Sequence, residues 1–146
     1  MDENFVNGLK IAFASQYAFA LKAQNFHWNV EGSDFYQLHL LFETIYDEVY
    51  GAVDAFAENI RKIKAYTPAS LSRFSSLTEI DDETRLLLSE GMVAELLADA
   101  EKMQEIMKFM FVQAEELGEH GLSNFLADRQ DAFAKHAWFL RATIKA

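Results

Sequence analysis

The chain has 146 residues, of which 51% are hydrophobic and 14% aromatic, so it suits one domain, residues 1–146, with a sizeable core. It contains no cysteine, which excludes disulfides and thiolate zinc sites and is consistent with a reducing cytoplasm. The formal net charge of −10 disfavours nucleic-acid binding unless basic residues cluster, and it suits the attraction of metal cations.

Helical spacing of apolar residues predicts a first helix from about residue 4 to 29 and a second from about 35 to 64. Ser33 or Asp34 is the expected N-cap of the second helix. The apolar stretch in the first helix is interrupted by polar residues and follows the acidic start MDEN, so we expect no export signal. No apolar run reaches about 18 residues, which predicts no membrane span and, with the missing signal, a cytoplasmic location.

Pro68 ends the second helical region, and the segment after it is too long for a simple loop. Its middle, residues 69–74, is predicted to form a short helix across the bundle. A third helix is expected from about 82 to 117 and a fourth from about 122 to 144, with Ser123 as its N-cap. These elements predict an all-α bundle of four long helices.

Four side chains that can bind a divalent metal share the second predicted helix. His39 is followed on one polar stripe by Glu43, Asp54 and Glu58, at about 40°, 60° and 100° around the helix axis. The fifteen residues from His39 to Asp54 span about 22 Å, so these two cannot bind the same metal within one chain. Two copies packed antiparallel about a twofold axis would bring His39 of one chain to Asp54 and Glu58 of the other.

The alternative is a site inside one bundle, which commonly uses a Glu-x-x-His pair on each of two helices. The residues three positions before the four histidines are Gln24, Tyr36, Leu117 and Phe133. Because none is glutamate, the site between chains is favoured. His120 and His136 have no partner at a matching spacing, and we expect them to have surface or packing roles.

This pattern resembles the Dps family of mini-ferritins, the DNA-binding proteins from starved cells. The residues that carry the resemblance are His27, Trp28, His39, Glu43, Asp54 and Glu58. It extends to the stretch AEELGEHGLSNFLADRQ and to Trp138, and so covers nearly the whole chain.

The resemblance implies a ferritin-like four-helix bundle with a short crossover helix between the second and third helices, assembled as a hollow homododecamer. It implies a ferroxidase, an oxidoreductase that oxidises Fe(II) with hydrogen peroxide or oxygen, stores ferric iron and protects against oxidative damage. His27 and His39 would bind the first iron. Asp54 and Glu58 would come from the partner chain, with Glu58 bridging two irons.

Three roles stay open for Glu43: a direct ligand, an acceptor that orients a histidine ring, or an interface residue. Trp28 either packs or lies beside the metals, where its indole could donate an electron. By resemblance, Glu119, Asn124 and Asp128 would line a threefold pore through which iron enters. Asn124 stands where the family commonly has aspartate, so this pore would be less negative.

Family members that bind DNA tend to use a lysine-rich tail. This chain has no basic residue before Lys10 and ends RATIKA, so we expect weak or no DNA binding. Two rival functions remain: a structural or DNA-protecting shell with weak ferroxidase activity, and a shell that uses zinc or manganese, since the ligand types do not exclude either metal.

Overall fold

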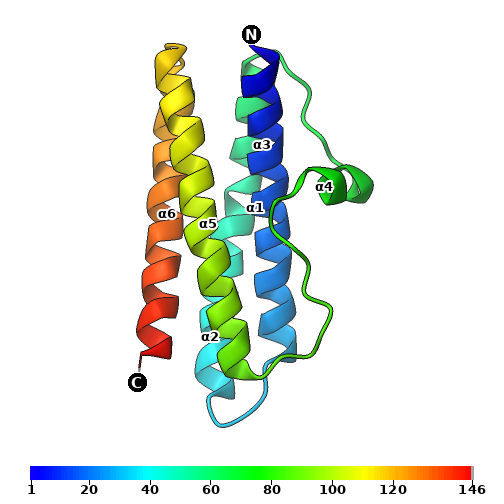
Figure 1. Cartoon of the computed structure of the whole chain (residues 1–146), viewed down its shortest axis with the longest axis vertical. Helices are drawn as coiled ribbons and strands as arrows, with labels where there is room; N and C mark the ends of the chain where they lie inside the picture. Colours follow the sequence, from blue (N-terminus) through cyan, green and yellow to red (C-terminus); the bar gives the residue numbers. More distant parts are fainter. Residues whose placement is uncertain (146) are drawn as a thin grey trace.

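The computed structural model describes residues 1–145, which form six helices and no strand. The helices are α1 (Glu3–Asn29), α2 (Phe35–Gly51), α3 (Val53–Lys62), α4 (Leu71–Leu77), α5 (Ser89–Glu116) and α6 (His120–Ile144). Helices α1, α5 and α6 and the joined pair α2–α3 are the long rods of the bundle, and the short α4 lies outside it (Figure 1). The predicted all-α bundle with a short crossover helix is confirmed.

The core lies along the inner faces of the four rods, where α5 packs on α6 and α1 packs on both α2 and α5. Six phenylalanines are fully buried, and their rings fill much of this interior: Phe5, Phe19, Phe26, Phe42, Phe56 and Phe133. Burial of such aromatic area stabilises the bundle, because each ring removes a large apolar surface from water. Within residues 1–145, no helix is both long and apolar enough to cross a membrane.

The second predicted helix, residues 35–64, is not continuous, because the chain leaves the α-helix at Ala52. The N–H of Ala52 bonds to the carbonyl of Val49 at 3.2 Å, which tightens this turn. The buried amide of Gln16 on α1 also donates to the Val49 carbonyl, at 3.2 Å. A side chain inserted into the hydrogen-bond ladder interrupts a helix, and Gly51 beside it has low helix propensity.

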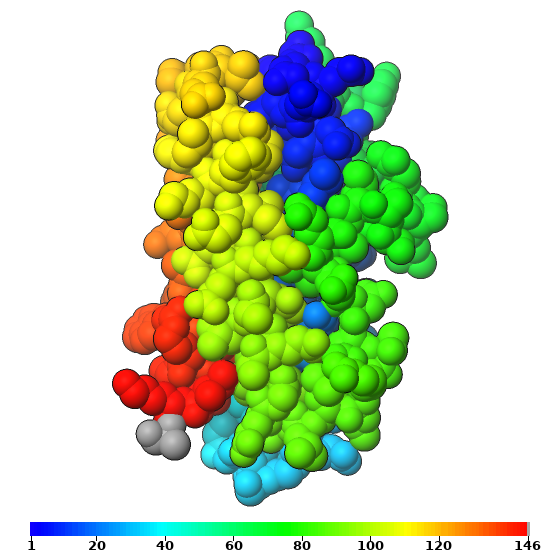
Figure 2. All heavy atoms as spheres, in the orientation of Figure 1, coloured from blue at the N-terminus to red at the C-terminus, as the bar shows by residue number. Residues whose placement is uncertain are grey.

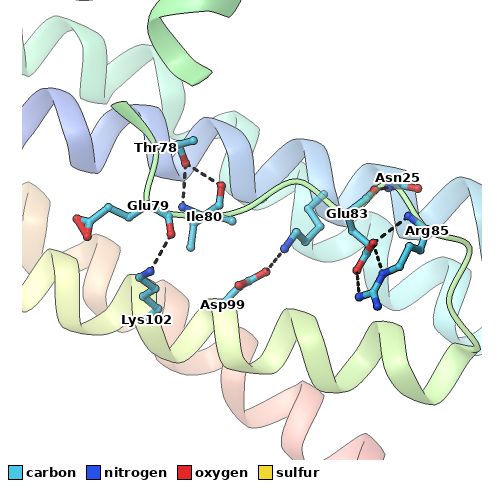
Figure 3. Close-up of polar contacts among 9 residues, drawn as sticks. Asn25, Thr78, Glu79, Ile80, Glu83, Arg85, Asp99 and Lys102 are labelled. Atoms are coloured by element: carbon cyan, nitrogen blue, oxygen red, sulfur yellow. Dashed lines mark hydrogen bonds and ion pairs between the residues drawn. The ribbon is translucent and has the colours of Figure 1, made fainter. Parts of the chain in front are cut away.

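The third predicted helix begins at Ser89 and not at residue 82. Residues 78–88 instead form an extended connector that covers part of α1 (Figure 2). Side chains of α1 and α5 hold it against the bundle. Ser15 accepts from the Glu79 N–H at 2.9 Å. Lys102 donates to the Glu79 carbonyl at 2.8 Å (Figure 3). Ile80, only 1% exposed, anchors the connector in the core. These long-range contacts hold the connector against the bundle before α5 begins.

The link between α5 and α6 is a tight turn at Gly118, whose φ of +74° suits glycine best. The last helix begins at His120, two residues before the predicted start. Ser123 is not its N-cap, because it lies within the helix, after Glu119 at the N-cap position. Its hydroxyl donates to the Glu115 carboxylate at 2.7 Å. This bond joins the two helices of the hairpin.

Candidate metal site

The end of α1 and the start of α2 bring two histidines together. His27 lies in the last turn of α1, and His39 lies near the beginning of α2, after the turn at residues 30–34. Their rings stack with centroids 3.8 Å apart and an angle of 17° between planes. His27 is buried and His39 is half-buried, so the pair is shielded on one side and accessible on the other.

Reciprocal hydrogen bonds fix the tautomer of this pair. Nδ1 of His27 lies 2.7 Å from the backbone oxygen of His39, and Nδ1 of His39 lies 2.7 Å from that of His27. Because a carbonyl oxygen only accepts hydrogen bonds, each Nδ1 must carry the proton in these contacts. Both Nε2 atoms are then lone-pair donors, which is the arrangement that a metal-binding histidine pair needs.

Glu43 lies one turn after His39 and completes the cluster. Its Oε1 is 3.6 Å from Nε2 of His27. One ligand atom from each of His27, His39 and Glu43 lies within 4.8 Å of the others. Since both Nδ1 atoms bond to carbonyls, the Glu43 carboxylate orients neither ring through Nδ1 and lies instead beside the available nitrogen lone pair.

Asp54 and Glu58, the two other predicted ligands, are not part of this cluster. Both are exposed on α3, which continues the line of α2 away from the histidine pair (Figure 1). The structure of one chain therefore joins three of the five predicted ligands. Assignment of the two carboxylates to a partner's site stays a prediction.

The remaining predicted residues lie at or near the surface of the single chain. Trp28 is 62% exposed. Asn124 and Asp128 are exposed on α6, while Glu119 is half-buried and lines a hollow of about 200 Å³ together with Lys62. Surface positions are compatible with a pore at a chain contact, which stays a prediction.

A polar network between α1, α2 and α6 was not anticipated from the sequence. The Glu48 carboxylate accepts from Nη1 and Nη2 of Arg129 and contacts Nε2 of His136 at 2.7 Å. Arg129 also donates through Nε to Gln16 at 3.1 Å. Burial alone would raise the pKa of Glu48, but the hydrogen bonds from His136 and Arg129 outweigh it and lower that pKa to about 2.

The network bears on where metal can bind, because it engages the Glu48 carboxylate inside the bundle. Arg129 is 4% exposed, and its charge is neutralised by Glu48, which is therefore not a free metal ligand. One sequence signal could have revealed the network: Arg129 and His136 are seven residues apart on the buried stripe of the last helix. Two such groups on a buried face need an acidic partner.

Comparison with known proteins agrees with this architecture. Residues 6–146 match the family model of the ferritin-like domain. A relative from Bacillus anthracis, DNA protection during starvation protein 2, is 30% identical over 142 residues, covering 97% of each chain. The crystal structure of Dps from Thermosynechococcus elongatus superposes with a TM-score of 0.95 at 25% identity, over 99% of this chain and 92% of that one.

A further solved structure is the Dps protein from Vibrio cholerae O1, described as a member of a broad superfamily of ferritin-like diiron-carboxylate proteins. It is 25% identical, with a TM-score of 0.92, over 98% of this chain and 90% of that one. The bundle and its matched domain thus define a ferritin-like protein. Within that class, the chain belongs to the Dps family.

Proposed function

We propose that this protein oxidises ferrous iron at sites shared by two chains and stores the ferric product inside a hollow dodecamer in the cytoplasm, which limits oxidative damage. The observation that carries the proposal is the histidine pair, in which both Nδ1 atoms bond to carbonyls and Glu43 lies beside Nε2 of His27. Second-sphere bonds of this kind hold a ligand set ready before the metal arrives.

The donor set suits iron that must change oxidation state. Imidazole binds Fe(II) well, and carboxylate favours the harder Fe(III) product. His27, His39 and Glu43 would bind iron on one chain, while Asp54 and Glu58 would come from the partner, with Glu58 as the bridge. Two ferrous ions then give two electrons, with two protons, to one hydrogen peroxide, which yields two ferric ions and two waters without releasing a hydroxyl radical.

Apolar side chains beside the histidine pair support assembly with a second copy. Four large residues near the end of α1 and along α2 are at least 40% exposed in the single chain: Trp28, Phe35, Tyr36 and Leu40. A soluble monomer rarely leaves such a group uncovered. An antiparallel partner would bury this surface and bring its Asp54 and Glu58 to the site.

The experiment that tests this function is stopped-flow absorbance after anaerobic loading with two ferrous ions per chain, followed by peroxide or air. We expect rapid oxidation with peroxide and slower oxidation in air. In His39→Ala the rate should fall by more than about tenfold, because one nitrogen ligand is lost together with the ring that stacks on His27. The shell should keep its mass, measured by light scattering.

His120→Ala is the matched control, since the His120 side chain is 72% exposed and far from the pair along the chain. Its oxidation rate should equal that of the unaltered protein. An unchanged rate in His39→Ala would show that the site is wrongly assigned. If the intact shell oxidises iron no faster than protein-free buffer, a structural role or a zinc or manganese site becomes the better explanation.

A further inference from the structure

Three tyrosine rings form a continuous path that starts at the histidine pair. The His27 and Tyr46 ring centroids are 5.2 Å apart, those of Tyr46 and Tyr50 are 6.0 Å apart, and those of Tyr50 and Tyr17 are 5.7 Å apart. Each contact is edge-to-face, with interplanar angles of 65°, 78° and 80°. Aromatic edges in contact are close enough for an electron to pass from ring to ring.

The path is built from two helices. Tyr46 and Tyr50 are four residues apart, so they lie on one face of α2, and Tyr17 reaches them from α1. All three are half-buried, and Tyr46 and Tyr50 pack against the core. At its far end, Tyr17 and Tyr50 line a cavity of about 560 Å³.

The surroundings of Tyr50 favour the protonated phenol. Burial and the neighbouring Tyr17 and Tyr46 raise the pKa of Tyr50 above its ordinary value. The Tyr50 hydroxyl lies 3.5 Å from the side-chain oxygen of Gln24, its nearest acceptor. Packing alone does not require these hydroxyls, since phenylalanine would fill the same ring positions without a polar group to solvate.

We propose that Tyr46, Tyr50 and Tyr17 form an electron relay that completes the reduction of hydrogen peroxide when only one ferrous ion occupies the site; this rests on the ferroxidase function proposed above. One Fe(II), one peroxide and one tyrosine give one Fe(III), one hydroxide, one water and one tyrosyl radical. Iron supplies the first electron, the phenol supplies the second, and the phenol proton goes to the water.

The radical then moves along the path by electron and proton exchange, in which Tyr46 regains its hydrogen and Tyr50 or Tyr17 becomes the radical. A second ferrous ion ends the sequence: with one proton, it reduces the radical back to the phenol and becomes Fe(III). Each peroxide thus still oxidises two irons, even when the irons arrive one after the other. The relay prevents release of a hydroxyl radical during that interval.

The test is freeze-quench electron paramagnetic resonance of the assembled protein, mixed with one ferrous ion per site and an equal amount of peroxide. The intact protein should show a tyrosyl radical that disappears when a second equivalent of ferrous ion is added. Tyr46→Phe should lose this signal and release hydroxyl radical to a spin trap. Tyr66→Phe is the matched control, since Tyr66 is 78% exposed and outside the path, and it should behave like the intact protein.

Tyr50→Phe is a second variant, which should keep a radical at Tyr46 but shorten its lifetime because the path is cut. Oxidation with two ferrous ions per site is measured on every sample and should be the same in all. Three results, each with normal oxidation, would show that the relay is wrong while the ferroxidase function stands. No tyrosyl radical forms, or the radical persists in Tyr46→Phe, or the radical is a tryptophanyl radical that is lost only in Trp28→Phe. If the intact protein oxidises no iron, both proposals fall.

Discussion

At the scale of single residues, Glu48 has the most strongly perturbed environment near the middle of the bundle. It accepts hydrogen bonds from two groups on α6, Arg129 and His136, while 38% of its own side chain faces solvent. Arg129 in turn bonds to Gln16, which reaches the helix break at Val49. One carboxylate therefore neutralises the cation on α6 and links it to the geometry of α2.

Replacing Glu48 with Gln should lower the free energy of unfolding by about 1–3 kcal/mol at pH 7. This loss is smaller than for a fully buried ion pair, because Glu48 is partly solvated. The folded pKa of about 2 lies below the ordinary value of 4.5, so this contribution is present above pH 4.5 and is lost as pH falls towards 2. Urea unfolding of both proteins from pH 7 downwards, at one protein concentration, measures the difference. A difference that does not shrink in acid would contradict the assignment to Glu48 ionisation.

At the scale of elements, an ion pair between α1 and α5 lies beneath the connector. Nζ of Lys22 is 2.8 Å from Asp99, and the two side chains are only 3% and 15% exposed. Burial raises the pKa of Asp99 above its ordinary value, although the hydrogen bond from Lys22 acts in the opposite direction. The pair thus does not fully offset the cost of burying the carboxylate.

Lys22→Met should therefore destabilise the fold by about 3 kcal/mol at pH 7, because it leaves the Asp99 carboxylate buried without its cation. The loss should shrink at lower pH, where Asp99 is protonated. The double variant Lys22→Met with Asp99→Leu should recover most of the stability, since it removes both charges from the interior. Denaturant unfolding of the three proteins measures these values, and a double variant as unstable as the single one would refute the argument.

At the scale of the whole molecule, the two halves of the proposed site lie on different helices of one chain. His39 is at one end of the α2–α3 rod, and Asp54 is beyond the break at Ala52. If the site forms between chains, a defect in either half can be complemented by a partner that carries the other defect. A site within one chain allows no such rescue.

Shells that are co-assembled from equal amounts of His39→Ala and Asp54→Ala chains should regain about a quarter of the native oxidation rate. Half of random pairs are mixed, and one of the two sites in a mixed pair is intact. Stopped-flow oxidation, compared with shells of each variant alone, measures the gain. A mixture no faster than the average of its two parents would exclude a shared site.

The sequence by itself determined the four long rods and the short crossover helix, because apolar periodicity along a helix is a local property. The pairing of His27 with His39 was implied by the resemblance to the Dps family. Helical spacing also excluded Asp54 from the metal site of His39 within one chain. Local patterns gave no hint that Asp54 lies beyond a helix break, or that residues 82–88 are extended.

Only the tertiary structure decided those features, because their hydrogen-bond partners come from far along the chain. Gln16 reaches Val49 across 33 residues, and Arg129 reaches Glu48 across 81. The tautomer of the histidine pair, the position of Glu43 beside Nε2 and the contact of Tyr17 with Tyr50 likewise depend on how helices pack. Periodicity shows which face of a helix is buried, but the partner that satisfies each polar group on that face is chosen by the fold.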